Sequence, residues 1–509
     1  MGKPLTYAVV GSGASALGVL TALIKQPSVV ITIFDIGDIV PEPTNGPIAN
    51  IEAARAYYAT LYRQLRQIHP RKFPPPKTHL GQQITRTSVG QRLSVFRSGT
   101  FGGLTNYWGA TLLPFTDREF VGWPITRQQL NPYYRSTAEI LGVSGRADEL
   151  NIYFSEDFAT LPEIQPTPTL ALLDQTINRH QQSNAFRIIS GFNRCSVETR
   201  DDFSNHCIYC GECMAGCVRG AVFSSGKVIK TYLVHPRVKY VRGRVWRVDG
   251  SRGEVECVPS GSSNTETIGG FAKIFISAGC PATTEIVMRS MGICAGPTMK
   301  DNAVYTFPIL YLGKKPDGVD NSKYLALSNL IVGCIPTAAS EPFAQIQIYP
   351  NLDYLWRYNL PDFAWKMMGP LIEKLRHRLA WARLYLHSAY SQSYKCDIPD
   401  ERGEMRLRVT SPPDCTYYVK HLMNSIRKVL NNDDFYVPPI APIRERTNSH
   451  YAGTLPFNGQ WIPVSSNGEL IPRRVYVCDA STFPTSPAVS PTFSIIANAC
   501  RVATEALNG

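Results

Sequence analysis

The chain has 509 residues, which suggests about two to four domains and a large buried core. Its 44% hydrophobic and 18% charged residues are typical of a globular protein and exclude disordered, collagen-like and coiled-coil chains. The formal net charge of +12 suits nucleic acid, an anionic membrane surface or an acidic substrate, and the odd total of 13 cysteines argues against a secreted disulfide framework.

The N-terminal residues have the pattern of a dinucleotide-binding unit. Residues 7–10 and 29–34 read as buried strands, and between them lie a glycine-rich turn and a helix over 17–24. This order of strand, turn, helix and strand is typical of a Rossmann-type unit for NAD or FAD. The turn would contact the pyrophosphate, and the acid after the second strand would accept ribose hydroxyls. The candidate residues are Gly11, Ser12, Gly13, Ala14, Ser15 and Asp35.

The C-terminal residues favour FAD. Residues 474–478 read as another buried strand, and an apolar helix opens at 491–493 after a turn. In flavoproteins that begin with a Rossmann unit, such a strand, turn and helix return to the flavin, and the helix N-terminus can donate N–H groups to the ring. The candidate residues are Asp479, Ala480, Thr492 and Phe493.

Further segments give the chain a resemblance to the glucose–methanol–choline family of FAD-dependent oxidoreductases. They are Gly-Gly-Leu-Thr-Asn-Tyr-Trp-Gly at 102–109, Ile-Phe-Ile-Ser-Ala-Gly at 274–279 and Ser-His-Tyr-Ala-Gly-Thr at 449–454. Within the family the chain is most similar to a bacterial branch that carries a cysteine cluster and includes sugar dehydrogenases.

The resemblance implies an α/β fold with two domains. A Rossmann-type FAD-binding domain would be assembled from the separated segments 1–125, 220–302 and 444–509. An inserted α+β substrate domain on an antiparallel sheet would take up 126–219, which holds the cysteine cluster, and 303–443. The family also implies close approaches of the backbone to FAD, a flavin-side wall and an adenine contact. Those residues are Gly102, Gly103, Asn106, Trp108, Val245, Ala278 and Gly279.

Alcohol oxidation needs a group that takes the hydroxyl proton while hydride leaves for flavin N5, and histidine suits this task. The resemblance places the catalytic histidine at His450. Family members usually carry a second His or Asn before the proline that opens the last helix, but this chain has Ser490 there. Serine can form hydrogen bonds but is no base at neutral pH. Either His450 works with Ser490 through a water, or Asn448 or a residue of the substrate domain takes the second place.

Four cysteines have the C-x₂-C-x₂-C-x₃-C spacing of bacterial ferredoxins: Cys207, Cys210, Cys213 and Cys217. Three of these thiolates can hold a three-iron cluster and four can hold a four-iron cluster, with Cys195 and His206 as spare ligands nearby. Zinc, disulfides and free thiols are the alternatives. An iron–sulfur cluster would give the electrons an exit other than oxygen.

Residues 354–387 are predicted to form an amphipathic helix, with Leu371, Leu375 and Leu379 on one face and basic residues and tryptophans around them. Such a helix can lie on a membrane surface, or it can pack over a sheet with a solvated basic face. No apolar run reaches the length of a membrane span, so we expect a cytoplasmic protein that is at most peripheral at a membrane. The basic residues are dispersed and form no nucleic-acid-binding module.

Alternating patterns at 304–312, 343–349 and 404–410 predict strands of the inserted sheet. We therefore expect an enzyme that oxidises an alcohol with FAD, and the resemblance suggests a sugar or glycan hydroxyl as substrate. Its electrons would pass to an acceptor through the cluster. One alternative is an oxidase of a lipid-like or polyketide alcohol that uses oxygen. The other is a flavoprotein without catalysis that transfers electrons or scaffolds a complex.

Overall fold

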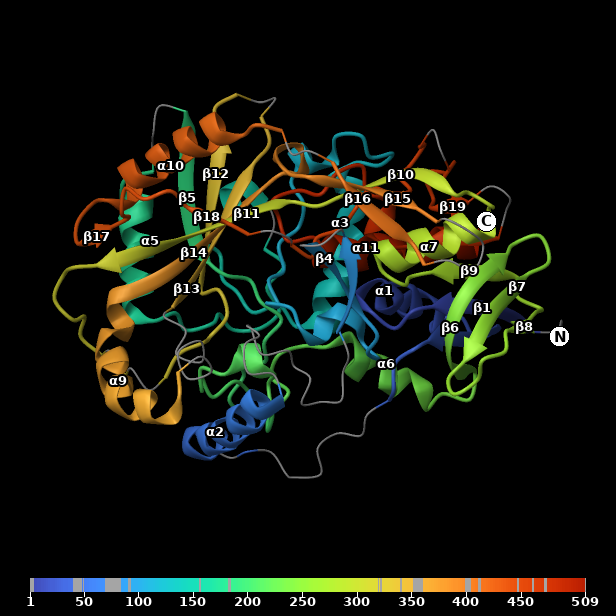
Figure 1. Ribbon diagram of the computed structural model, residues 1–509, viewed down its shortest axis with the longest axis horizontal. Coiled ribbons are helices and arrows are strands. Elements are labelled where there is room, and N and C mark those ends of the chain that lie inside the picture. The colour runs from blue at the N-terminus through green and yellow to red at the C-terminus, as the bar shows by residue number, and fades with distance from the viewer. Residues whose placement is uncertain are drawn as a thin grey trace.

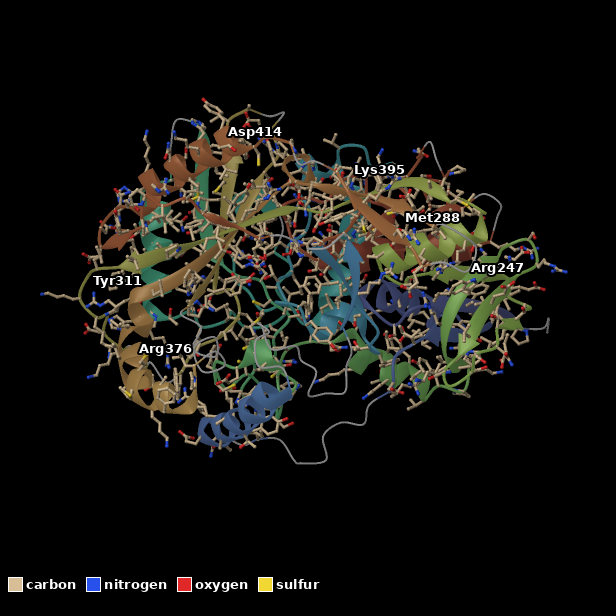
Figure 2. The ribbon with its side chains drawn as sticks, viewed as in Figure 1. Arg247, Met288, Tyr311, Arg376, Lys395 and Asp414 are labelled. Carbon is tan, nitrogen blue, oxygen red and sulfur yellow. The ribbon has the colours of Figure 1, made fainter. Side chains whose placement is uncertain are left out.

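The computed structural model describes most of the chain. The described residues are 4–39, 48, 50–68, 84–89, 93–154, 157–181, 185–318, 320, 323–338, 341–350, 360–398, 404–410, 413–445, 448–459, 462–470 and 474–508. Two large sheets occupy the two ends of the long axis (Figure 1). In Figure 2, Arg247 and Met288 lie in the half of the molecule that contains the first sheet, and Tyr311 and Arg376 lie in the half that contains the second.

The first sheet contains the predicted Rossmann unit. Its eight strands have the order β19–β20–β9–β1–β2–β6–β7–β8, and the five from β20 to β6 pair in parallel. The last four residues of β1 are all buried, as expected for a parallel sheet that is covered on both faces. The strands are β1 (Leu5–Val10), β2 (Val29–Asp35), β6 (Val238–Asp249), β7 (Glu254–Pro259), β8 (Glu266–Ile268), β9 (Lys273–Ile276), β19 (Glu469–Leu470) and β20 (Val475–Val477).

Helices from both ends of the chain cover this sheet. The helix after β1 packs against the C-terminal helix, and both belong to the largest hydrophobic core of the described residues. Thr126 caps the next helix, where its side chain accepts a hydrogen bond from the backbone N–H of Gln129, as its sequence position suggests. The helices of this half are α1 (Ala14–Leu23), α3 (Arg127–Leu141), α4 (Asn151–Phe154), α6 (Ser225–Leu233), α7 (Cys280–Ser290) and α11 (Thr492–Asn508).

The second sheet is antiparallel, with the order β17–β11–β14–β13–β12–β5 and with β18 paired to β11. Two helices, α5 (Pro168–Arg179) and α10 (Thr416–Leu430), pack on one face of it and form a second core. The other face of β13 and β14 turns toward the functional site. The strands are β5 (Phe186–Phe192), β11 (Ala303–Tyr311), β12 (Leu330–Pro336), β13 (Ala344–Pro350), β14 (Leu379–Leu386), β17 (Phe435–Tyr436) and β18 (Ile443–Arg444).

The prediction of one helix over 354–387 is wrong. Residues 354–359 lie outside the described residues, α9 covers Asp362–Leu375, and after a short turn the chain enters β14. Leu379 therefore starts a strand, and Arg383 follows on that strand. The leucines at a spacing of four imitated a helical face, but residues 379–386 also alternate. Pairing with β11 and β13 favours the strand.

The segment 404–410 is a strand as predicted, but it does not join the inserted sheet. Its strand β16 (Arg406–Val409) pairs with β15 (Ser393–Asp397), which pairs with β10 (Ala295–Lys300), in a separate three-stranded sheet. Apart from short 3-10 helices, the remaining described elements are α2 (Ile51–Ile68) and the hairpin of β3 (Ile84–Val89) and β4 (Leu93–Ser98). Among the helices that the structure describes, none combines the length and the apolar character of a membrane span. Peripheral membrane contact stays a prediction, as do the domain boundaries.

Candidate functional site

A cavity of about 980 Å³ extends from the glycine-rich turn after β1 to strands β13 and β14 of the second sheet. Its size lies at the upper end of the range for small-molecule sites. Residues predicted to hold a cofactor line one part of it, and His450 lines another part. The predicted cofactor and catalytic sites thus share one continuous space.

The turn after β1 allows close approach of the backbone. Gly11 has a φ of +112°, and a Cβ atom on it would lie 2.3 Å from the carbonyl oxygen of Ser277, so a side chain does not fit between β1 and β9. Gly103 has a φ of +60°, and a Cβ atom on it would lie 3.0 Å from the Cα atom of Gly13. Two glycine segments that are far apart in the sequence therefore meet at the cavity wall.

Ser12 ties these segments to the acid at the end of β2. Its Oγ donates a hydrogen bond to Asp35 Oδ2 over 2.9 Å and accepts one from the backbone N–H of Gly102 over 2.9 Å. The backbone N–H of Gly37 donates to Asp35 Oδ1 over 2.7 Å. Burial raises the pKa of Asp35 to about 6, although these hydrogen bonds act in the opposite direction. The carboxyl group is thus held in one position at the cavity wall.

Most predicted cofactor contacts line the cavity. They are Gly11, Ser12, Gly13, Ala14, Ser15, Asp35, Gly103, Trp108, Val245, Ala278, Gly279, Asp479, Ala480 and Thr492. The other three lie behind this surface. The N–H of Gly102 is bonded to Ser12, the Asn106 amide donates to Thr100 and to the Phe101 carbonyl, and Phe493 packs on Tyr134. That any of them contacts FAD stays a prediction.

The turn and the start of α1 fit a phosphate group. The first N–H groups of α1 lie beside the cavity, and a helix N-terminus favours anions. The Ser15 hydroxyl is buried at the cavity wall and has no hydrogen-bond partner among the described residues. The first turn of α1 contains no acid that would repel a phosphate. These observations suit the pyrophosphate of a dinucleotide.

His450 lies where the cavity meets the second sheet. Its ring stacks on Tyr385 of β14 with centroids 5.7 Å apart and an interplanar angle of 21°. Burial, assisted by the charge of Arg383, lowers the pKa of His450 to about 3. The imidazole is therefore neutral near pH 7, which a proton acceptor requires.

Asn302 determines which nitrogen of His450 carries the proton. Asn302 Nδ2 lies 3.0 Å from the carbonyl oxygen of Pro487 and 3.0 Å from His450 Nδ1. A carbonyl oxygen only accepts, so this atom of the amide must be the nitrogen, and it donates to Nδ1 as well. Asn448 donates to Asn302 Oδ1 on the other side. The neutral ring then has its proton on Nε2.

Ser490 is connected to the substrate-side sheet. Its Oγ accepts a hydrogen bond from Gln347 Nε2 over 3.0 Å, and Gln347 Oε1 accepts one from the Tyr349 hydroxyl over 2.7 Å. All three side chains are buried and line the cavity together with His450. The sequence left open which residue accompanies His450, and Gln347 from the second sheet is a candidate that no motif marks.

Arg383 on β14 also lines this part of the cavity. Glu445 accepts hydrogen bonds from its Nε over 2.9 Å and from its Nη2 over 2.6 Å. Thr306 on β11 donates to the same carboxylate over 3.0 Å. Sequence analysis missed Arg383 as a site residue because it placed this residue on a helix. The alternation of residues 379–386 is the signal that would have found it.

The four clustered cysteines do not form a metal site in this structure. They pack in one hydrophobic cluster, and burial raises the pKa of Cys210 to about 12. In the part of the chain that the structure describes, no group of three or more His, Cys, Asp or Glu side chains could hold a metal ion. All 13 cysteines are described, and none forms a disulfide. The geometry therefore supports neither an iron–sulfur cluster nor zinc.

Comparison with known proteins agrees on the fold. No family model and no curated protein matches the chain. Pyridoxine 4-oxidase from Mesorbium loti matches with a TM-score of 0.64, 14% identity and coverage of 99% of both chains. A formate oxidase variant from Aspergillus oryzae RIB40 matches with a TM-score of 0.62, 12% identity and coverage of 99% of this chain and 98% of the other. An FAD-dependent oxidoreductase from Chaetomium thermophilum matches with a TM-score of 0.59, 14% identity and coverage of 98% of both chains.

The chain has the fold of these oxidoreductases. The predicted α/β architecture, a Rossmann-type domain assembled from separated segments with an inserted domain on an antiparallel sheet, is confirmed. At identities of 12 to 14%, the likeness extends to the fold alone.

Proposed function

We propose that this chain is an FAD-dependent oxidoreductase that oxidises an alcohol. The observation that carries the proposal is the single cavity, which joins a dinucleotide-type turn to a neutral histidine. The neighbours named as oxidases and as an FAD-dependent oxidoreductase support flavin-dependent oxidation in this fold. A lone Rossmann unit would suit NAD as well, but the start of α11 also lines the cavity and offers N–H donors to a flavin ring.

Residues from three parts of the chain would hold FAD. The turn from Gly11 to Ser15 and the N-terminus of α1 would take the pyrophosphate, and Asp35 would accept the ribose hydroxyls. Val245 would meet the adenine, and the start of α11 at Thr492 would face the flavin. When bound, FAD supplies an acceptor for the two electrons of a hydride.

His450 would handle the hydroxyl proton. As the alcohol becomes a carbonyl, it loses a hydride from carbon and a proton from oxygen. Because Asn302 does not line the cavity, Nε2 is the nitrogen of His450 that is available to the substrate. With its proton on Nε2, the ring donates a hydrogen bond to the hydroxyl oxygen. To accept the proton there, the ring must carry its own proton on Nδ1, and the Asn302 amide must turn its oxygen toward it.

The wall beside His450 supports a hydroxyl-rich substrate. Gln347, Tyr349, Ser490 and Arg383 present amide, hydroxyl and guanidinium groups to the cavity. Such a wall suits a sugar, as the resemblance to sugar dehydrogenases suggests, better than a lipid-like alcohol, whose alkyl chain would leave these groups without partners. We assign no electron-transfer step to the cysteines. Their iron–sulfur cluster stays a hypothesis, which iron and sulfide analysis of anaerobically purified protein tests.

Replacement of the proposed proton acceptor tests the function. We expect His450→Ala to retain FAD but to reduce it roughly 10²- to 10⁴-fold more slowly under argon, because general base catalysis contributes about that much. The measurement is bleaching of the flavin absorbance with a panel of sugars, sugar acids, benzylic alcohols and long-chain alcohols. His421→Ala is the matched control, since that histidine is exposed on α10 and lies outside the cavity lining. Equal bleaching rates in His450→Ala and the unaltered enzyme would contradict the assignment.

A further inference from the structure

Charge is unevenly distributed along the cavity wall. The acids among its described lining residues are Asp35, Glu285, Glu404 and Asp479, and none of them lies on the second sheet. The second sheet contributes one charged lining residue in the described part of the chain, Arg383. The substrate half of the cavity is thus lined by a cation without an acid on the same wall.

The strand geometry aims Arg383 at the cavity. On β14, its neighbours Ala382 and Leu384 face the core under α10, so Arg383 points to the opposite face. Gln347 lies directly across from it on β13 and faces the same side. The Arg383 side chain is 30% exposed, whereas Tyr385 on the same face is buried.

Glu445 holds the guanidinium from behind. Its carboxylate accepts hydrogen bonds from the N–H of Nε and from one N–H of Nη2. Glu445 itself does not line the cavity. A guanidinium has two forked edges, and this pairing leaves the N–H groups of Nη1 and the second one of Nη2 on the other edge. That edge has the geometry that binds a carboxylate with two parallel hydrogen bonds. The Tyr349 hydroxyl lies within hydrogen-bonding reach of the same guanidinium.

This site is close to the proposed point of reaction. The Arg383 Cζ atom lies 5.4 Å from the centre of the Tyr385 ring, and the His450 ring stacks on that ring at 5.7 Å. One small molecule can therefore reach both groups. We propose that Arg383, oriented by Glu445, binds a carboxylate of the substrate, so that the alcohol oxidised beside His450 belongs to a hydroxy acid. This inference rests on the proposed function and specifies its substrate class.

The arrangement also couples binding to the proton transfer. The charge of Arg383 contributes to the low pKa of His450. A carboxylate bound to Arg383 neutralises that charge and makes His450 a better proton acceptor. A neutral alcohol of the same shape leaves the field of Arg383 in place. Substrates with a carboxylate gain in binding and in the rate of the chemical step.

Matched pairs of alcohols test the proposal on the unaltered holoenzyme. The pairs are 4-(hydroxymethyl)benzoate with benzyl alcohol, gluconate with glucose, and 3-hydroxybutyrate with 2-butanol, each followed by flavin bleaching under argon. We expect the acid of at least one pair to reduce the flavin roughly tenfold to a hundredfold more efficiently than its neutral partner, as one charge-assisted hydrogen-bonded contact provides. Benzoate, which has no hydroxyl to oxidise, should bind and perturb the flavin spectrum.

Variants of Arg383 identify the residue responsible. Arg383→Gln should remove the preference for acids and raise the Kd of benzoate roughly tenfold or more, whereas Arg383→Lys should retain part of both. Arg383→Gln leaves the charge of Glu445 unpaired, which can prevent folding. In that case the double variant Arg383→Gln/Glu445→Gln, which removes both charges, replaces it. Arg408→Gln is the matched control, because Arg408 pairs with Asp397 at the surface and lies outside the cavity lining.

The outcomes separate this inference from the proposed function. If neutral alcohols bleach the flavin as fast as their acids, or if the Arg383 variants keep the preference, the carboxylate site is wrong and the oxidoreductase remains. If no alcohol in the panel bleaches FAD in the loaded enzyme, the proposed function fails, and this inference fails with it.

Discussion

At the scale of single residues, hydrogen bonds decide which chemistry His450 can perform. The carbonyl of Pro487 orients the Asn302 amide, and that amide donates to Nδ1, which places the neutral ring's proton on Nε2. Burial and Arg383 keep the ring uncharged. His450 is thus neutral, as a base must be. Its proton is on Nε2, however, so toward the cavity the ring is a hydrogen-bond donor. The orientation of one amide controls the change between the two roles.

Replacement of this amide by a carboxylate should convert His450 into a stronger base. In Asn302→Asp, the carboxylate would accept the proton on Nδ1, free Nε2 and raise the pKa of His450. Because a base is inactive when protonated, the rate of flavin reduction should fall at a higher pH on the acid side than in the unaltered enzyme. The measurement is the pH profile of flavin reduction, with Asn302→Leu as the control that supplies no acceptor. An unchanged profile in Asn302→Asp would show that the amide does not control the tautomer.

At the scale of elements, the junction between β10 and β11 holds the segment of His450. Asp301 Oδ1 accepts the backbone N–H of His450 over 3.2 Å, and its Oδ2 accepts that of Asn448 over 3.0 Å. Lys300 and Ala452 exchange backbone hydrogen bonds beside them. Asp301 is buried, and no cation contributes to its pKa shift, so burial raises the pKa of its carboxyl group to about 7.

The raised pKa of Asp301 predicts a pH dependence of stability. The folded protein holds the proton more tightly than the unfolded chain, whose aspartates titrate near pH 3.9. Asp301 therefore adds to the free energy of unfolding in full below about pH 4, and this contribution is lost as the pH rises toward about 7. In Asp301→Asn, which cannot ionise, the melting temperature should fall less between pH 4 and 7. Asp434→Asn, which changes an exposed aspartate, is the comparison. Parallel melting curves for Asp301→Asn and the unaltered protein would refute this role.

The elements also differ in how well the sequence could predict them. Strands β1 and β2 of the first sheet carry local signals, since two apolar runs, a glycine turn and Asp35 all lie within residues 5–35. The wall of Gln347 and Arg383 depends on the pairing of β13 with β14, which are separated along the chain by α9 and by residues outside the described part. Leucines at helical spacing obscured β14, and Asn302 belongs to no motif. Sequence therefore named many of the residues that line the cavity near the first sheet, together with His450, but it did not name Gln347 or Arg383 on the second sheet.

At the scale of the whole molecule, the proposed FAD site is assembled from distant segments. β1 and β2 come from the N-terminal part of the chain, β6 and β9 from its middle, and β20 and α11 from its C-terminal end (Figure 1). A ligand that contacts all three segments stabilises their joint arrangement, because the unfolded chain offers no such site.

We therefore expect FAD to raise the melting temperature of the protein stripped of cofactor. At a free concentration 100 times the Kd, the gain in free energy of unfolding is about 2.7 kcal/mol. The measurement is thermal unfolding during titration with FAD, with NAD as the matched ligand that shares the adenosine pyrophosphate. Gly11→Val should abolish the shift, since its Cβ would collide with the Ser277 carbonyl. A shift with NAD that equals the shift with FAD would argue against a flavin site.

The contact between α1 and α11 has a consequence for how the protein folds during its synthesis. α1 leaves the ribosome long before α11, the helix that packs against it, is synthesised. Until α11 emerges, the apolar residues that α1 buries against it lack their final partner. Long-range contacts of this kind slow folding and expose the nascent chain to aggregation. The core that α1 and α11 share can therefore form only after α11 has been synthesised, which makes the packing of α1 a late step in folding.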